Sequence, residues 1–234
     1  LYEREALLGG QLNLAVKPPH KGRIQALIDY FENQLRKLGV IVKLETEITS
    51  AVIENNKPDA VVIATGVGPF VPEIPGIKGK NVAPAEDVLC NRVEPGSKVV
   101  IIGGELVGCE TAEFLADRGR QVTITRRGSE MALNMPSHLR AFLLPRLREK
   151  GVTMMTGVKY EQITDKGLTV TGRDGQSQLI EADTIVLAAG ARPNTELMSK
   201  LQGKVPEIYA VGDCSEPRGI LEAIADGSRI ARLV

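Results

Sequence analysis

A glycine-rich turn at residues 103–108, GGELVG, follows the apolar run VVII at 99–102 and precedes a helix-forming segment. In this arrangement the N-terminal amides of the helix can hold the pyrophosphate of a dinucleotide. Glu105 stands where the pattern G-x-G-x-x-G has its second glycine, and its side chain and charge both oppose a pyrophosphate. The alternative is that this strand–turn–helix unit has the same fold, packs within the protein and binds no nucleotide. The residues expected at the coenzyme are Gly103, Gly104, Val107 and Gly108.

Two arginines, Arg126 and Arg127, end the next expected strand. When the nucleotide is NAD, this position normally carries an acid that binds the ribose 2′-hydroxyl. Guanidinium groups suit a 2′-phosphate instead. The pair therefore favours NADP(H), and two solvated arginines on a loop are the alternative.

A second acidic position lies in the segment EIYAVGDC, where Asp213 follows Gly212 at the end of an apolar strand. A helix is expected from about Gly219. The carboxylate of Asp213 could accept hydrogen bonds from a polyol while the helix N-terminus faces an electron-rich ring. The alternative is that Asp213 only caps that helix.

No side chain is predicted to act as a catalytic acid, base or nucleophile. None of the three cysteines has a partner at C-x-x-C spacing, which argues against a disulfide reductase. His20 and His138 are isolated, so no metal site is predicted. Hydride transfer between bound cofactors needs orientation and electrostatics rather than such groups.

The elements that must position these residues occur twice along the chain. The segment DAVVIATG begins at Asp59 and DTIVLAAG at Asp183, an offset of 124 residues (183 minus 59). Glu3 in LYERE matches Arg126 in VTITRR, and glutamate is the residue type that binds a ribose, so the copies are expected to bind different nucleotides. The unit with the glycine-rich turn has no counterpart in the first copy. The chain is therefore expected to begin inside a domain.

The alternation of apolar strands and amphipathic helices predicts an α/β fold of two Rossmann-like dinucleotide-binding domains. The second domain is expected to be nested in the first, which is truncated at its N-terminus. The expected bounds are 1–96 and 195–234 for the first domain and 97–194 for the nested one. Strands are expected at about 40–44 and 59–64, and a helix over 22–38.

The 234-residue composition is balanced, with 29 basic and 29 acidic residues and no Trp. Scattered charges without interleaved aromatic residues give little support for a nucleic-acid partner. No apolar run reaches the ~18 residues of a membrane helix. Three widely spaced cysteines fit a reducing compartment. A cytoplasmic protein without nucleic-acid or membrane partners is expected.

Long segments of the chain resemble a known family. GGQLNLAVKPPHKGRIQALIDYFENQLRKLGV, EIYAVGDC and GDCSEPRGILEAIADGSRIA are similar to the C-terminal FAD and NAD(P) region of the Old Yellow Enzyme-like reductases. This group includes 2,4-dienoyl-CoA reductase, 2-enoate reductase and NADH:flavin oxidoreductases. The resemblance implies FAD and NAD or NADP as cofactors. The residues that it places at FAD are Glu3, Gly10, Gln11, Leu12, Thr65, Gly66, Gly212, Asp213, Ile220 and Leu221. It adds Gly190 and Ala191 at the border of the NAD(P) site.

The resemblance also implies an N-terminal barrel that holds FMN and an iron–sulfur cluster and reduces the substrate. No cysteine cluster of suitable spacing occurs here, so this half is expected on a part of the protein outside the chain. The expected function is hydride transfer from NAD(P)H to FAD for reduction of an enoate or enoyl-type substrate. Two alternatives stay open: a free-standing pyridine-nucleotide oxidoreductase that reduces a small electron carrier, and a non-catalytic nucleotide-binding or structural domain with a decayed coenzyme site.

Overall fold

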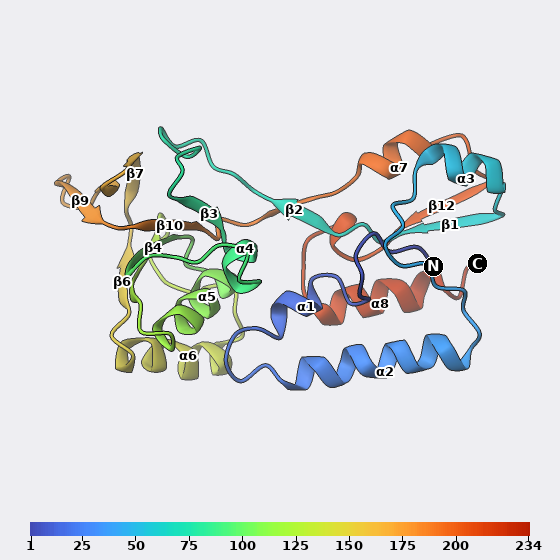
Figure 1. The fold of residues 1–234 in the computed structure, drawn as a ribbon, viewed down its shortest axis with the longest axis horizontal. Helices are drawn as coiled ribbons and strands as arrows, with labels where there is room; N and C mark the ends of the chain where they lie inside the picture. The colour runs from blue at the N-terminus through green and yellow to red at the C-terminus, as the bar shows by residue number, and fades with distance from the viewer. The chain divides into compact units, whose positions relative to one another are not determined.

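The computed structural model describes residues 1–234, which divide into two compact units. Unit 1 comprises Leu1–Asn13, Arg23–Gly68 and Ala191–Val234, and unit 2 comprises Leu14–Gly22 and Pro69–Gly190 (Figure 1). Each unit combines parallel strand pairing with helices, so the expected α/β class is confirmed.

The sheet of unit 2 has five strands, all parallel. Its central strand is buried on both faces, which explains why the sequence there is a continuous apolar run. In spatial order the strands are β3 (Val82–Pro84), β10 (Thr184–Leu187), β4 (Lys98–Ile102), β5 (Gln121–Arg126) and β6 (Thr153–Thr156).

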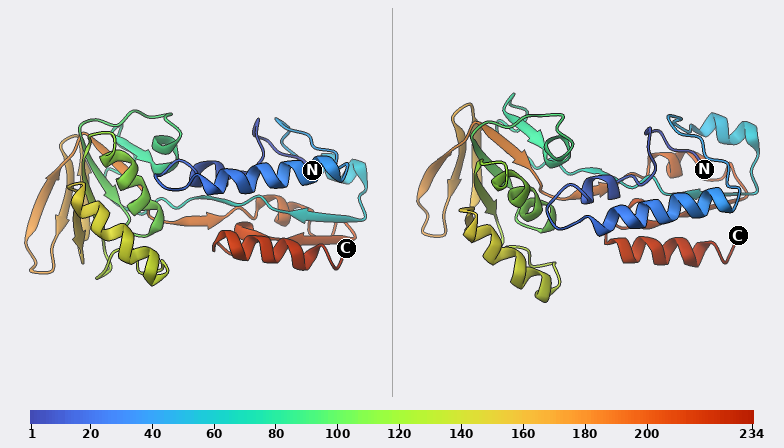
Figure 2. Two further views of the ribbon diagram at one scale, coloured as in Figure 1. Left: turned by 90° about the horizontal axis from the view of Figure 1, so that it is seen from below. Right: turned by 60° about the horizontal axis from the view of Figure 1, so that its bottom comes forward.

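Different layers cover the two faces of this sheet, as Figure 2 shows. Val99 and Ile101 of β4 pack on one face with helices α4 (Ala85–Leu89), α5 (Leu106–Ala116) and α6 (Ser137–Glu149). Val100 and Ile102 point to the other face. They pack there against an antiparallel sheet of β7 (Lys159–Thr164), β8 (Gly167–Thr171) and β9 (Ser177–Glu181).

The main segment of unit 2 begins at Pro69, well before residue 97. The reason is that β3 adds an edge strand to the sheet, with Val82 opposite Ile185 of β10. Val88 and Leu89 of α4 also belong to the core of this unit. The compact unit 2 therefore includes the segment 69–96, which connects the two expected domains. The expected bounds of the cofactor-binding domains themselves stay a prediction.

Unit 1 has a smaller parallel pair, in which Ala60 of β1 (Ala60–Ile63) lies opposite Glu207 of β12 (Glu207–Ala210). In place of the strand expected at 40–44, the structure has a single parallel bridge between Tyr2 and Lys43. Residues on either side of this bridge do not extend it into a ladder. The helices are α1 (Leu12–Ala15), α2 (Arg23–Lys37), α3 (Ser50–Asn56), α7 (Glu196–Leu201) and α8 (Ile220–Ile230), with a 3₁₀ turn over Gly212–Cys214.

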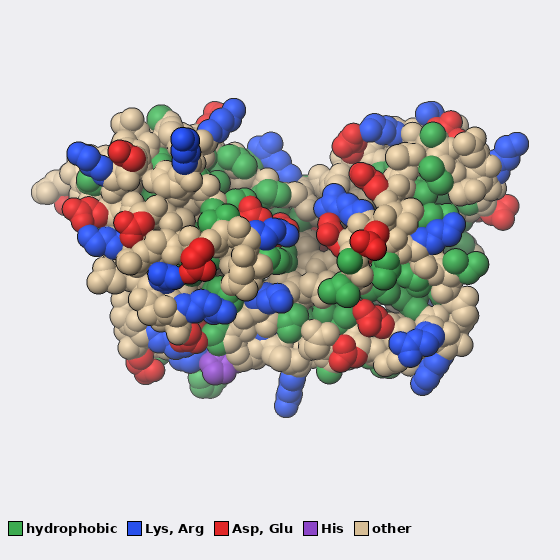
Figure 3. Space-filling model, viewed as in Figure 1, with side chains coloured by type: hydrophobic (Ala, Val, Ile, Leu, Met, Phe, Trp, Pro, Cys, Tyr) green, Lys and Arg blue, Asp and Glu red, His purple; other side chains and the backbone are tan.

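Two short strands, β2 (Val67–Pro69) and β11 (Ala191–Pro193), pair where the chain passes from one unit to the other. Lys and Arg side chains alternate with Asp and Glu over the face drawn in Figure 3, in keeping with the balanced composition. No helix has both the length and the apolar character needed to cross a membrane.

Candidate nucleotide-binding sites

The glycines of the 103–108 turn are required by close packing. A Cβ added at Gly103, whose φ is +124°, would overlap the carbonyl oxygen of Ala188 at the end of β10. A Cβ at Gly108 would in turn overlap the carbonyl oxygen of Gly103. Only glycine therefore lets helix α5 start so close to the strand ends.

The N-terminal end of α5 is open. The first backbone hydrogen bond of the helix runs from the Cys109 N–H to the Glu105 carbonyl at 3.0 Å. The N–H groups of Leu106, Val107 and Gly108 therefore have no acceptor within the helix. Leu106 and Val107 are also exposed. This end of the helix suits an anion such as a pyrophosphate.

Glu105 and Arg126 form an ion pair across the turn, between Oε1 and Nη2. Oε1 is buried and makes no directed hydrogen bond, so its contact with the guanidinium is electrostatic. The other oxygen, Oε2, accepts the Asn134 N–H at 3.1 Å. From the sequence alone, Glu105 is interpreted as an obstacle to a pyrophosphate, and Arg126 as a cation free to bind a phosphate. The structure instead joins the two side chains.

Carbonyl groups of the loop that follows β5 accept hydrogen bonds from two arginines. Arg126 Nη1 donates to the Glu130 carbonyl at 2.5 Å, and Arg173 Nη2 donates to the Ser129 carbonyl at 3.2 Å. Arg127 differs, because it is exposed and its guanidinium carbon lies 5.4 Å from the centre of the Tyr160 ring. Of the two arginines singled out by the sequence, Arg127 is the one without a carboxylate partner.

Gly190 and Ala191 lie just beyond Ala188, the residue that contacts the turn. Gly190 has a φ of +114°, and its carbonyl accepts the Phe70 N–H at 3.0 Å. The chain crosses between units at this point. Their expected role at the border of the coenzyme stays a prediction.

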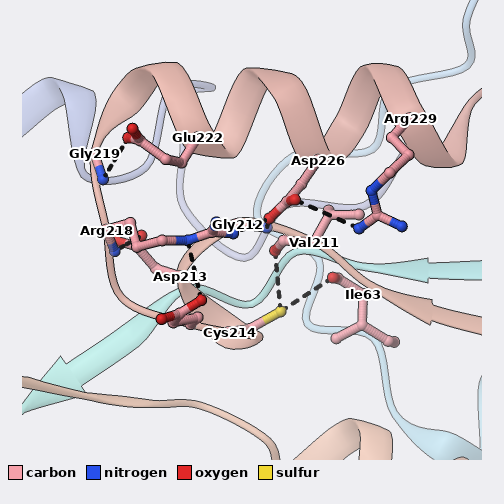
Figure 4. Close-up of polar contacts among 11 residues, drawn as sticks. Ile63, Val211, Gly212, Asp213, Cys214, Arg218, Gly219, Glu222, Asp226 and Arg229 are labelled. Carbon is pink, nitrogen blue, oxygen red and sulfur yellow. Dashed lines mark hydrogen bonds and ion pairs between the residues drawn. The ribbon is translucent and has the colours of Figure 1, made fainter.

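Asp213, Gln11 and Gly66 come together in unit 1. Asp213 Oδ2 accepts from Gln11 Nε2 at 3.1 Å, and a Cβ on Gly66 would lie 3.6 Å from the same nitrogen. Asp213 Oδ1 accepts the Arg218 N–H at 3.1 Å. Asp213 is not the N-cap of α8, because that position is Gly219 (Figure 4).

The neighbours of Asp213 are held by a second acid that sequence reasoning missed. Asp226, on α8, accepts the Gly212 N–H at 3.3 Å and binds Arg218 Nη2 at 2.6 Å (Figure 4). Gly212 has a φ of +63°, which favours glycine at this bend. Asp226 has no motif around it, and only the return of α8 to the strand end reveals its role.

The other residues expected at FAD are more dispersed within unit 1. Thr65 Oγ1 donates to the Asn194 carbonyl at 2.6 Å. Glu3 lies beside the Tyr2–Lys43 bridge, where Oε1 accepts the Glu5 N–H at 3.0 Å. No contact joins Glu3 to Asp213. Gly10 (φ +49°) and Leu12 lie at the start of α1, and Ile220 and Leu221 are exposed at the start of α8.

Helix α5 carries two acids with opposite pKa shifts. Burial raises the pKa of Glu110, which pairs with Lys21. Burial acts in the same direction on Glu113, but hydrogen bonds from Arg146 and Lys150 outweigh it and lower the pKa of this carboxyl. These ion pairs anchor helix α5, which follows the turn, to neighbouring segments. No sequence motif predicted them.

One cavity in unit 2 lies away from the turn. Its volume is about 570 Å³, and residues 76–81 and 163–165 line it. None of the residues expected at a nucleotide contributes to it. No three His, Cys, Asp or Glu side chains converge on a point where a metal ion could bind.

Comparison with known proteins gives a consistent result. Residues 54–227 match the model of the family "Pyridine nucleotide-disulphide oxidoreductase". The chain is 35% identical to the NADH oxidase of Thermoanaerobacter brockii over 99% of the chain and 36% of that protein. It is 31% identical to the cinnamate reductase of Clostridium sporogenes, over 99% of the chain and 35% of that protein.

Among solved structures, 2-naphthoyl-CoA reductase in complex with 2-naphthoyl-CoA matches with a TM-score of 0.96 and 33% identity. The match covers 100% of the chain and 36% of that protein, so the chain spans about a third of such relatives. The resemblance to the FAD and NAD(P) region of the Old Yellow Enzyme-like reductases is confirmed, as are FAD and NAD(P) as the cofactors of such a domain. The chain belongs to the pyridine nucleotide-disulphide oxidoreductase family.

Proposed function

We propose that this chain is the region of a flavin-dependent oxidoreductase that receives hydride from NAD(P)H onto FAD. FAD and NAD(P)H, when bound, would supply the hydride acceptor and donor. The observation that carries the proposal is that one chain has two different sets of groups that could each bind a nucleotide. The open amide end of α5 behind close-packed glycines is one, and the cluster of Asp213, Gln11 and Gly66 is the other.

The residues of unit 1 fit a flavin. The carboxylate of Asp213 is oriented by the Arg218 N–H and by Gln11, and can accept further hydrogen bonds from ribityl hydroxyls. The N-terminal end of α8, with Ile220 and Leu221 exposed, would offer backbone amides to the ring. Glu3 would bind the adenosine ribose. These groups bind and orient, so none has to move a proton.

The residues of unit 2 fit a pyridine nucleotide. The amides of Leu106 and Val107 would bind the pyrophosphate, and Gly103 and Gly108 would let it approach. Arg127 would meet a 2′-phosphate, because it is exposed and has no carboxylate partner. We therefore expect NADP(H) to be accepted at this site.

The substrate class follows from the relatives. Cinnamate is an unsaturated carboxylate and 2-naphthoyl-CoA a conjugated thioester, which suggests an enoate or enoyl-type substrate for the whole protein. The substrate would be reduced on a preceding barrel domain with FMN and an iron–sulfur cluster, outside this chain. Cytoplasmic localisation belongs to the same proposal.

The test is a flavin analysis of the whole protein. Wild type should release FAD on denaturation, and its flavin absorption bands should bleach anaerobically with NADPH or NADH. Asp213→Ala should lose FAD and keep FMN, while the control Asp59→Ala, at an exposed residue near β1, should keep both. Wild-type protein without FAD, or FAD retained by Asp213→Ala, would contradict the proposal. Absence of bleaching would favour the non-catalytic alternative.

A further inference from the structure

We propose that Arg126 is a positioning residue that neutralises Glu105 and holds its carboxylate away from the coenzyme. In this way the turn accepts a pyrophosphate although its second glycine is absent. The inference rests on the proposed function, because it concerns how the same site tolerates Glu105. It differs from the interpretation of Arg126 as a ligand of the 2′-phosphate.

The first support is where the Glu105 carboxylate lies. Glu105 is the N-cap of α5, yet its side chain makes no capping hydrogen bond to the helix. Oε1 is drawn to Arg126, and Oε2 accepts the N–H of Asn134. Both oxygens are therefore held on the side of the loop that follows β5. The amides at the start of α5 stay available to an anion.

The second support is how firmly Arg126 is held. Its side chain is only 18% exposed, and Nη1 is bound to the Glu130 carbonyl. Gly104 packs closely against Met131 and Arg126: a Cβ there would overlap Met131 Sδ and would lie 3.0 Å from the Arg126 Cβ and 3.3 Å from its Cδ. A glycine at this position therefore leaves space for both side chains. A guanidinium bound on two sides is poorly placed to reach a 2′-phosphate.

The charges of Glu105 and the pyrophosphate set the expected loss of coenzyme affinity when Arg126 is removed. Without Arg126, the Glu105 carboxylate would be an unpaired negative charge roughly 5 Å from a pyrophosphate, and the repulsion at an effective dielectric near 20 weakens binding by about tenfold or more. The pyrophosphate is common to both coenzymes. Loss of Arg126 should therefore weaken NAD⁺ and NADP⁺ by the same factor, whereas loss of a 2′-phosphate ligand would weaken NADP⁺ alone.

The experiment is calorimetric titration of the whole protein with NAD⁺ and with NADP⁺. Arg126→Ala should weaken both by about tenfold or more, and the double variant Glu105→Gln/Arg126→Ala should recover both to within about threefold of wild type. The control is Arg173→Ala, which removes another guanidinium that is bound to the same loop, through the Ser129 carbonyl, and leaves the Glu105–Arg126 pair in place. Glu105→Gln should not improve binding in that background.

Three results would overturn the inference. They are a loss confined to NADP⁺ in Arg126→Ala, a double variant as weak as the single one, and an equal gain from Glu105→Gln in the Arg173→Ala background. The double variant also removes the unpaired carboxylate that could unfold the single variant, so the comparison stays decisive. Wild type that binds neither coenzyme would refute the proposed function itself, and this inference with it.

Discussion

Replacement of Glu113 by Gln should destabilise unit 2 more than any other loss of an acid on α5. Glu113 is 1% exposed and receives two hydrogen bonds from Arg146, at 2.8 and 3.1 Å. Lys150 lies 3.2 Å from its Oε1 and also pairs with Asp117. The substitution keeps the size of the side chain and removes its charge, so the change isolates the ion pairs between α5 and α6.

The magnitude follows from what remains after the change. Two charge-assisted hydrogen bonds, worth about 1.5–3 kcal/mol each, become at most one neutral bond of about 1 kcal/mol. Breaking a fully buried pair costs about 3–5 kcal/mol, but the Arg146 and Lys150 side chains are 35% and 26% exposed and can regain water. We therefore expect a loss of about 2–3 kcal/mol at neutral pH.

The assay is urea unfolding followed by far-ultraviolet circular dichroism at several pH values. The folded pKa of Glu113 lies below its ordinary value of 4.5, so its carboxylate stabilises the fold in full above that value. This stabilisation is lost as the pH falls through the folded pKa. The difference between wild type and Glu113→Gln should therefore be large at pH 7 and shrink below pH 4.5.

The matched control is Glu196→Gln, which breaks the exposed pair of Glu196 and Lys200 on α7. Because water and salt screen that pair, no measurable change is expected. A loss at Glu113 no greater than the loss at Glu196 would refute the reasoning. So would a difference that stays constant between pH 7 and pH 3, because it would show that packing rather than charge carries the effect.

Three further outcomes can be tested on the same protein. Gly108→Ala should destabilise by about 3 kcal/mol or more in urea unfolding because its Cβ would overlap a turn carbonyl, while Gly227→Ala on α8, with open space around it, should stabilise by about 0.5–1 kcal/mol. Maleimide labelling at pH 8, read by peptide mass spectrometry, should modify half-buried Cys90 and spare Cys109, whose pKa burial raises to about 12; equal labelling would contradict this burial. Burial also raises the pKa of Glu110 above 4.5, so wild type should lose stability relative to Glu110→Gln as the pH rises through the raised value, and an opposite slope in pH-dependent unfolding would exclude this assignment.

The strand–turn–helix unit from Lys98 to Ala116 was predictable because two constraints agree there. A strand buried on both faces must be continuously apolar, and close packing at Gly103 and Gly108 admits no side chain. The edge strand Val82–Pro84 was not predictable, since its three residues are too few to show a period. The expected strand at 40–44 had the right residue types, but its pairing stops at one bridge.

The site residues likewise divide into those that a local sequence pattern reveals and those that only the fold brings together. Gly212 and Asp213 stand next to each other in the chain, so their neighbourhood was visible in the sequence. Asp226 joins them only through the return of α8, and the ion pair of Glu105 with Arg126 depends on the pairing of β4 with β5. Contacts made across elements carry no local pattern. For this reason the sequence leads to separate interpretations of Glu105 and Arg126 and does not predict Asp226.

Glu105 and Arg126 show why that separation matters. Taken alone, Glu105 removes the glycine that admits a pyrophosphate, and Arg126 removes the acid that binds a ribose. By itself, the first departure suggests a weakened pyrophosphate site, and the second suggests a preference for NADP(H). Joined as an ion pair, the two charges cancel beside an open helix N-terminus, and Arg127 remains as the unpaired cation. A substitution in a binding motif is therefore best judged together with the residue that faces it across the fold, because one change can compensate for the other.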